Sequence, residues 1–267
     1  MGGHTSQYEP LDLSIAIVCK NNQATIGRTL GSVRGLASEI VAVDSGSTDQ
    51  TIPMLEAAGA RVINSPWLGH VLTKQLALQS CTRAWALCLD SDESPEPALA
   101  ASIREAIDRN EPAVLGYRVN RMVWYRGRPL RHTWQPEWRL RLVRRGAAKW
   151  TGLDPHDVLL FIDPLGRPRD LTGVLRHDSF ATFEEHFRKQ VQHATTMARS
   201  LHAAGKRGSR VRLLISPPGA FIKQLVLKRG FLDGKAGWLA AATTAAGTLI
   251  KHGVLLELDS AEQPGQM

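Results

Sequence analysis

The sequence has little cysteine, few acidic residues and no long apolar run. Its three cysteines stand singly, without the paired spacing of a zinc site or the even set of a disulfide framework. We interpret them as buried free thiols in a reducing compartment, which predicts a cytoplasmic protein. The first ten residues lack the basic and then apolar pattern of an export signal. We also expect no membrane span, because the longest apolar segment, residues 236–250, is shorter than the roughly 18–20 residues that a span requires.

The shortage of acidic residues is uneven along the chain. Lysine and arginine number 33 against 25 acidic residues, and the net charge is +8. Residues 117–150 hold nine Arg and one Lys with Glu137 as the only acid, and residues 205–252 hold nine basic residues with Asp233 as the only acid. Such an excess predicts an anionic partner, which can be nucleic acid, a phosphorylated substrate or an acidic membrane surface.

Apolar runs and helical periodicity alternate through the first half of the chain. Strands are predicted at residues 13–19, 39–43, 61–63 and 84–89, and helices at 25–33, 51–58, 70–79 and 95–108. This order predicts an α/β fold with an open, mostly parallel sheet that helices cover on both faces.

The second half is less regular. Strands are predicted at residues 114–119, 138–143 and 171–176, a helix at 183–204, and a basic, amphipathic region that starts at Pro217-Pro218. The domain prediction is a flexible N-terminus (1–11), a catalytic domain (12–180), a C-terminal helical region that associates with a membrane (181–258) and a flexible tail (259–267).

Acidic residues follow two of the predicted strands, at the sheet edge where ligands bind in open α/β folds. Asp90 and Asp92 flank Ser91 in an extended segment, which turns both carboxylates to one side. Hard oxygen ligands of this kind suit Mg²⁺ or Mn²⁺ and leave positions open for phosphate oxygens. The alternative is a loop of solvated acids before a helix. Asp44 can hydrogen-bond a nucleoside, or its segment can simply cap the following helix.

His156 and His177 are the candidates for a further metal ligand, since histidine is a frequent one. We favour His177 because it closes the predicted strand 171–176, which can return to the site. The alternative for each is a structural histidine.

The arginine-rich block suits a phosphorylated substrate, because the guanidinium fork matches phosphate geometry. Arg139 and Arg141 are its candidate contacts, and Trp134 can stack on a sugar ring; a solvated basic face and core packing are the alternatives. Further on, apolar and cationic residues alternate as in a helix at a membrane interface, with Trp238 as an anchor. The apolar set is Phe221, Leu225, Val226, Phe231 and Leu232, and the cationic set is Lys223, Lys228, Arg229 and Lys235. The alternative is a helix that packs on the catalytic domain.

Three segments resemble the inverting family 2 glycosyltransferases with a GT-A fold: Ser14–Asn22, VDSGSTDQT at residues 43–51 and LDSDE at residues 89–93. Other segments resemble the branch of lipopolysaccharide core β-1,4-glucosyltransferases, and the resemblance covers roughly residues 12–250. They are WLGH at 67–70, WQPEWRLRL at 134–142, His156-Asp157, LRHDSFATFEEHF at 175–187 and RGFLDG at 229–234.

The resemblance implies a nucleotide-sugar donor and assigns roles to individual residues. Asp44 with Ser45, and Asp90 with Ser91, would bind the nucleotide-sugar, Asp90 and Asp92 would bind the divalent cation, and Lys74 would face the diphosphate. Glu137 occupies the position of the family's catalytic base, with Asp157 as its rival. The alternative is that Glu137 only forms an ion pair with Arg139 or Arg141.

The resemblance also implies the reaction and its place in the cell. The predicted reaction transfers a hexose, with glucose favoured, from a UDP-sugar to a phosphorylated, lipid-linked saccharide of the lipopolysaccharide inner core. The enzyme would lie peripherally on the anionic cytoplasmic face of the inner membrane. The alternatives are a family relative that uses another acceptor (a polysaccharide-lipid or a peptide) and a nucleotidyltransferase. A basic nucleic-acid-binding protein is the most distant alternative; nucleic acid is not expected as a partner, because the strand-end acids would repel its phosphates.

Overall fold

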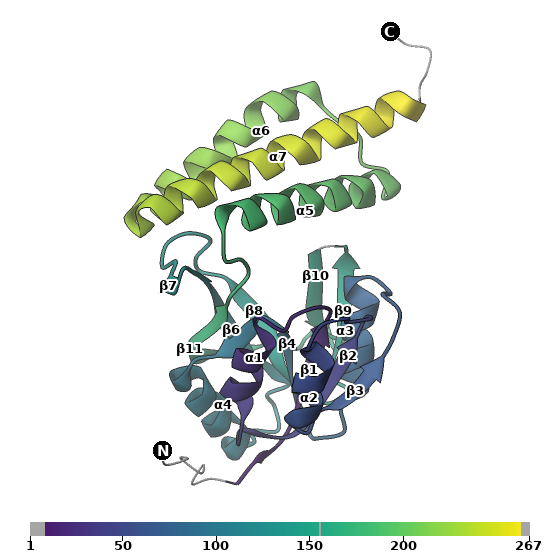
Figure 1. Cartoon of the computed structure of the whole chain (residues 1–267), viewed down its shortest axis with the longest axis vertical. Coiled ribbons are helices and arrows are strands. Elements are labelled where there is room, and N and C mark those ends of the chain that lie inside the picture. Colours follow the sequence, from purple (N-terminus) through teal and green to yellow (C-terminus); the bar gives the residue numbers. More distant parts are fainter. Residues whose placement is uncertain (1–8, 155, 263–267) are drawn as a thin grey trace. The chain divides into compact units, whose positions relative to one another are not determined.

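The computed structural model describes residues 9–154 and 156–262, which form two compact units. The first unit extends to Arg121 and adds Trp138–Thr151 and Val158–His177. The second comprises Met122–Glu137, Gly152–Asp157 and the chain from Asp178 onward. Each unit is described by itself (Figure 1).

A mixed nine-stranded sheet includes the strands of the first unit, in the order β3-β2-β1-β4-β8-β6-β11-β5; its ninth strand, β7, pairs with Trp124 and Tyr125 at the end of β6, in residues of the second unit. The strands β3, β2, β1 and β4 are parallel, and the strand pairs β4–β8, β8–β6 and β11–β5 are antiparallel. The strands are β1 (Leu11–Cys19), β2 (Ala37–Asp44), β3 (Arg61–Asn64), β4 (Trp85–Asp90), β5 (Glu93–Pro95), β6 (Gly116–Tyr125), β7 (Arg128–Pro129), β8 (Trp138–Arg144) and β11 (Arg169–His177).

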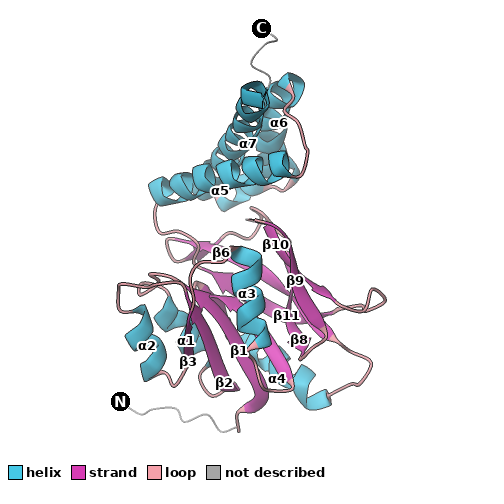
Figure 2. Ribbon diagram, turned by 90° about the vertical axis from the view of Figure 1, so that its right-hand side faces the viewer, coloured by secondary structure: helices cyan, strands magenta, loops and turns pink. Residues whose placement is uncertain are grey.

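Packed elements cover both faces of this sheet (Figure 2). The helices α1 (Ile26–Val33), α2 (Thr51–Ala57) and α4 (Pro97–Arg109) share a core with one face. Helix α3 (His70–Gln79) and the hairpin of β9 (Ala148–Leu153) and β10 (His156–Phe161) pack on the other. Because both faces are covered, residues 15–19 of β1 are an unbroken apolar run, in which Ile15, Ala16 and Ile17 are all buried.

Helices dominate the second unit. Its elements are α5 (Phe183–Ala203), α6 (Arg210–Ile222), the π-helical turn η1 (Lys223–Leu227), the 3₁₀ turn η2 (Gly230–Asp233) and α7 (Lys235–Glu262). Thr182 caps α5 by accepting a hydrogen bond from the amide of Glu185 (3.1 Å). Helix α7 packs along both α5 and α6.

The structure confirms the predicted α/β class and its parallel first half. It also contains the short strands β5 and β7 and the hairpin β9–β10, which carry no periodic signal in the sequence. The predicted flexible ends, residues 1–11 and 259–267, lie largely outside the described residues. Where the structure describes them, Leu11 already belongs to β1 and α7 continues to Glu262. The basic region does not start at Pro217-Pro218, because both prolines lie inside α6.

Helix α7 extends well beyond the apolar segment 236–250 on which the expectation of no membrane span was based. Over Lys235–Ala261 this helix is long and apolar enough to cross a bilayer by length and composition, and 33% of its most apolar window is buried against the protein. The glycines and threonines that interrupt the apolar residues do not end the helix. One such helix is weak evidence of a span, since the core helix of a soluble protein meets the same criterion.

Candidate functional site

The carboxyl ends of β2, β1 and β4 meet at one edge of the parallel half-sheet. In the strand register Cys19 of β1 lies opposite Asp44 of β2, and Val18 lies opposite Asp90 of β4. The predicted strand-end acids therefore flank the same strand, as parallel pairing requires.

Asp44 is engaged by its own loop. Its Oδ1 accepts hydrogen bonds from the amides of Gly46 (2.9 Å) and Ser47 (2.7 Å), and its Oδ2 accepts from the Ser47 hydroxyl. Only 1% of Asp44 is exposed. Its carboxylate therefore fixes the turn after β2, and a contact to the nucleoside stays a prediction.

The loop after β1 is fastened to the loop after β2. The amide of Asn21 donates to Ser47 Oγ (2.8 Å), and the amide of Thr48 donates back to Asn21 Oδ1 (2.8 Å). The amide of Gln23 donates to Asp49 Oδ2 (3.1 Å). Asn21 has a left-handed backbone (φ 54°), which asparagine tolerates better than most residues. These reciprocal bonds hold one rim of the candidate site.

Asp90 stands at the end of β4 among positive charges. Lys74 Nζ of α3 is 2.7 Å from its Oδ1, and Arg141 Nη2 of β8 is 3.5 Å from its Oδ2. Burial by itself would raise the pKa of Asp90, but the charges of Lys74 and Arg141 outweigh it and hold that pKa well below its usual range. Its side chain is still 23% exposed, so the ionised carboxylate remains accessible to a ligand.

Glu93 carries the most deeply buried charge of the site, with no exposed side-chain surface. Its Oε1 pairs with Arg141 (2.9 Å) and with Arg121 of β6 (3.1 Å), and its Oε2 accepts from the amide of Asp90 (3.1 Å). Sequence reasoning missed this role, although Glu93 ends the acidic motif and the arginine block is its natural complement. Arg141 has only 5% of its side chain exposed and joins Glu93 of β5 to Asp90 of β4, and its predicted contact to acceptor phosphate stays a prediction.

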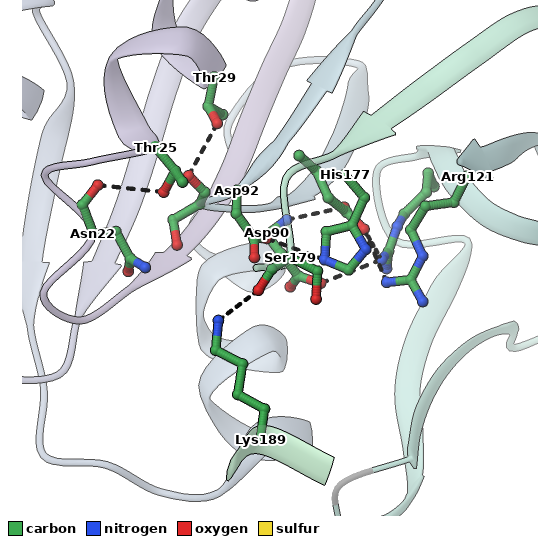
Figure 3. A network of polar contacts seen from close by, with 12 residues as sticks. Asn22, Thr25, Thr29, Asp90, Asp92, Arg121, His177, Ser179 and Lys189 are labelled. Atoms are coloured by element: carbon green, nitrogen blue, oxygen red, sulfur yellow. Dashed lines mark hydrogen bonds and ion pairs between the residues drawn. The ribbon is translucent and has the colours of Figure 1, made fainter. Parts of the chain in front are cut away.

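Asp92 and His177 approach each other beside Asp90 (Figure 3). His177 Nε2 is 3.4 Å from Asp92 Oδ1, and 22% of the Asp92 side chain is exposed. The pairing of β11 with β5 explains the contact, because His177 lies opposite Glu93 in the register. Within the described residues, His177 Nδ1 is buried and has no hydrogen-bond partner, and no group of three His, Cys, Asp or Glu side chains is spaced to hold a metal ion.

Ser45 and Ser91, which are predicted to bind the nucleotide-sugar, lie within the turns that follow β2 and β4. Ser45 Oγ is buried without a hydrogen-bond partner among the described residues, and the backbone carbonyl of Ser91 accepts from Thr29 Oγ1 of α1 (3.0 Å). The Thr29 contact fixes the backbone between Asp90 and Asp92.

Four other predicted residues belong to the second unit. Glu137, Asp157 and Trp134 are partly buried and His156 is exposed. Trp134 packs edge-on against Phe180 (6.4 Å between centroids), and its Nε1 donates to Thr244 (3.2 Å), so it is built into that unit. Arg139 is in the first unit, on β8, and is partly buried. Their catalytic or binding roles stay predictions.

A much larger cavity than the one beside the acidic strand ends lies away from these residues. It measures about 720 Å³ and is lined by Leu36, Ala100 and Arg104, among others, between the end of α1 and α4. Lys74, Asp90, Arg141 and Trp150 instead line a cavity of about 10 Å³, which holds about one water molecule. Cavity size alone would therefore point away from the acidic strand ends.

A sheet covered on both faces, with acids at the ends of its parallel strands, agrees with the GT-A class of glycosyltransferase fold. The chain belongs to glycosyl transferase family 2, whose family model matches residues 14–165.

Two relatives show the extent of this similarity. A lipopolysaccharide core biosynthesis glycosyltransferase, LpsC of Rhizobium meliloti (strain 1021), is 30% identical over 260 residues, covering 91% of this chain and 93% of the relative. An uncharacterized glycosyltransferase of Rickettsia typhi is 29% identical over 254 residues, covering 92% of this chain and 87% of the relative.

The solved structures are more distant. A mycobacterial protein gives a TM-score of 0.46 at 20% identity and covers 74% of this chain and 76% of its own. Glucosyl-3-phosphoglycerate synthase from Mycobacterium tuberculosis, solved with Mn²⁺, UDP and glucosyl-3-phosphoglycerate, gives a TM-score of 0.35 at 24% identity and covers 44% of this chain and 45% of its own.

Proposed function

We propose that the chain is an inverting, divalent-cation-dependent hexosyltransferase that acts on a phosphorylated, lipid-linked saccharide of the lipopolysaccharide inner core. The observation that carries the proposal is the set of strand-end groups Asp90, Asp92 and His177 in a family 2 glycosyltransferase. The relative LpsC, 30% identical over nearly the full length, supports the choice of acceptor.

The donor is proposed to be a UDP-sugar, with glucose favoured, bound at the edge formed by β2, β1 and β4. Asp90 is ionised and partly exposed, which suits a hydrogen bond to the ribose. Lys74, held 2.7 Å from Asp90, contributes positive charge for the diphosphate. Asp44 and Ser45 shape the turn against which the nucleoside would bind.

Asp92 and His177 are the proposed ligands of the cation, Mg²⁺ or Mn²⁺. The donor set fits, because a carboxylate and an imidazole meet at a partly exposed point, and the second imidazole nitrogen is buried without a partner within the described chain. When bound there, the cation neutralises charge on the diphosphate of the leaving group. His156 belongs to the second unit and remains the weaker candidate.

Glu137 is proposed as the general base, with Asp157 as the rival. The base takes the proton of the acceptor hydroxyl while the hydroxyl oxygen bonds to the anomeric carbon of the donor sugar. The bond from that carbon to UDP breaks on the opposite face. This displacement inverts the anomeric configuration. Arg139 and the exposed arginines Arg126 and Arg128 supply cationic groups for acceptor phosphates.

We place the enzyme on the anionic cytoplasmic face of the inner membrane, in contact through the second unit. The support is a set of exposed apolar side chains beside exposed lysines and arginines on α6 and the turns after it.

Binding of UDP tests the donor and metal proposal. We expect UDP to bind the full chain more tightly with Mn²⁺ than with a chelator in isothermal titration calorimetry, and Asp92→Ala to abolish that difference. Asp12→Ala, at an exposed position near the start of β1, is the matched control and should behave as the wild type. The proposal would be overturned if none of several nucleoside diphosphates bound more tightly with Mn²⁺ than with a chelator.

Transfer assays with purified inner-core saccharide test the acceptor. Glucose transfer to this acceptor with inversion supports the proposal. Donor turnover only with a polysaccharide-lipid or a peptide would instead select the family relative with another acceptor.

A further inference from the structure

The seven-residue loop from Arg131 to Glu137, which ends at the proposed base, lies wholly in the second unit. It carries little regular backbone bonding, and the one turn bond joins the Gln135 amide to the His132 carbonyl (3.2 Å). Trp134 adopts a left-handed backbone (φ 59°), which is costly for a bulky residue. Surrounding contacts must therefore hold the loop in this conformation.

Asp233 binds three successive amides of this loop. The carboxylate accepts from the amides of Arg131 (3.0 Å), His132 (3.0 Å) and Thr133 (2.7 Å), and His132 Nδ1 is a further 3.2 Å contact. Only 5% of the Asp233 side chain is exposed. Burial opposes the charge, but the amides of Thr133 and His132 outweigh it and lower the pKa of Asp233, so the carboxylate fills an anion-binding nest.

The next two residues of the loop are held by η1 and the residue after it. With its amide oxygen turned toward Trp134, Gln224 accepts from the Trp134 amide (2.7 Å) and shares the Trp134 Nε1 hydrogen (3.0 Å) with Thr244 Oγ1. Lys228 Nζ donates to the carbonyl of Gln135 (2.7 Å). Each residue from Arg131 to Gln135 is thus bonded by a side chain of the segment Gln224–Asp233.

The segment that makes these contacts is itself compact. Gly230 is buried, and a Cβ there would lie 2.6 Å from the carbonyl oxygen of Gln224, so only glycine lets η1 and η2 approach this closely. The close approach brings Gln224 and Asp233, nine positions apart, onto the same loop.

We infer that Gln224, Lys228 and Asp233 are positioning residues for Glu137. The second unit then fixes the position of the catalytic base, in addition to any membrane contact. The inference rests on the proposed function for the role of Glu137. A base displaced by about 1 Å loses about 10²-fold in rate, so loosening this loop should act on turnover.

The test compares Asp233→Ala with Asp259→Ala in the full chain. Asp259 is a matched control, because its carboxylate also accepts a backbone amide, that of Gly208, and lies near Arg207 and His202, but it fastens the α5–α6 connection. We expect Asp233→Ala to lower kcat about 10- to 100-fold with the KM for donor and the metal-linked binding of UDP unchanged. Asp259→Ala should change kcat less than twofold at a similar loss of thermal stability.

A double variant separates positioning from general damage. If Asp233 acts through Glu137, adding Asp233→Ala to Glu137→Gln should cost no further activity; multiplying effects would overturn the inference. Hydrogen exchange should show lost protection at the amides of residues 131–133 in Asp233→Ala only.

The two proposals fail differently. Lost protection with normal kcat overturns this inference and leaves the proposed function intact. Normal transfer by Glu137→Gln overturns the base assignment, and the inference with it.

Discussion

The Glu93 carboxylate has no contact with solvent and serves two arginines and one amide at once. A buried charge is tolerated only when its partners replace water, and removing one partner leaves the others uncompensated. Glu93 therefore links three strands: β4 through the Asp90 amide, β6 through Arg121 and β8 through Arg141.

Glu93→Gln tests this link. We expect the free energy of unfolding to fall by about 3–5 kcal/mol, because two guanidinium groups lose a buried countercharge. Denaturant unfolding measures the loss. Glu111→Gln breaks the exposed pair with Arg169 (2.7 Å) and should cost about 0–1 kcal/mol. Equal losses in the two variants would contradict the assignment.

His177 and His156 can be separated as metal ligands in the same way. His177→Ala should weaken Mn²⁺-dependent binding of UDP by about tenfold or more, because it removes a proposed ligand beside Asp92. His156→Ala should leave that binding unchanged. Titrations of UDP with and without Mn²⁺ measure both, and the reverse order of effects would move the site to His156.

At the scale of elements, α6 presents an unusual surface. Val211, Leu214, Ile215 and Ile222 are 53–73% exposed and follow helical spacing along one stripe, and no residue of this helix is buried. The turns that follow expose Val226, Leu227, Phe231 and Leu232, whereas Leu225, predicted on the same apolar face, is buried. The region predicted as one amphipathic helix is thus a helix followed by two turns. The turns place Gln224 and Asp233 in hydrogen-bonding contact with the loop 131–137.

Paired substitutions in α6 test the proposed membrane contact. Leu214→Glu with Ile215→Glu should reduce flotation with anionic vesicles several-fold at low salt, because both apolar burial and charge attraction are lost. Leu165→Glu is the control, since Leu165 is equally exposed (78%) in a loop of the first unit. Wild-type protein that stays with vesicles after alkaline carbonate extraction would instead indicate that α7 spans the bilayer.

At the scale of the whole molecule, the stability of the second unit should depend on pH through His186. This histidine is buried, stacks on Phe180 (4.0 Å between centroids) and bonds Thr243 through Nε2 (2.8 Å). Burial is the main cause that lowers its pKa from 6.5 to about 4, with Lys189 and His193 adding to it and Glu185 opposing.

The sign follows from linkage. Below pH 6.5 the unfolded chain binds a proton that the folded chain binds only near pH 4, so stability is complete above pH 6.5 and falls between these values. The loss amounts to about 3 kcal/mol at most. Thermal unfolding at pH 7.5 and pH 5 measures it, and His186→Gln should reduce the pH dependence. An unchanged pH profile in that variant would assign the effect to other groups.

Prediction from the sequence succeeded where the signal is local. Except for β5, the strands and helices up to Arg109 were predicted within a few residues, because a doubly covered strand is a continuous apolar run and a helix repeats every 3.6 residues. The short strands β5 and β7 escaped prediction, since two or three residues contain no period. Asp90 and Asp92 were found because an acid directly after a buried strand marks the ligand edge of a parallel sheet.

The α/β class, the parallel half-sheet and the acids at its strand ends could all be predicted from the amino-acid sequence, since each depends on residues within one segment. Three contacts follow from the tertiary structure alone: His177 with Asp92, Glu93 with Arg141, and Asp233 with the amides of residues 131–133. In these contacts Glu93 and Arg141 are 48 residues apart, Asp92 and His177 are 85 apart, and Asp233 and Arg131 are 102 apart. Periodicity carries no information over such separations, because strand pairing and loop packing join segments that their local sequences leave independent.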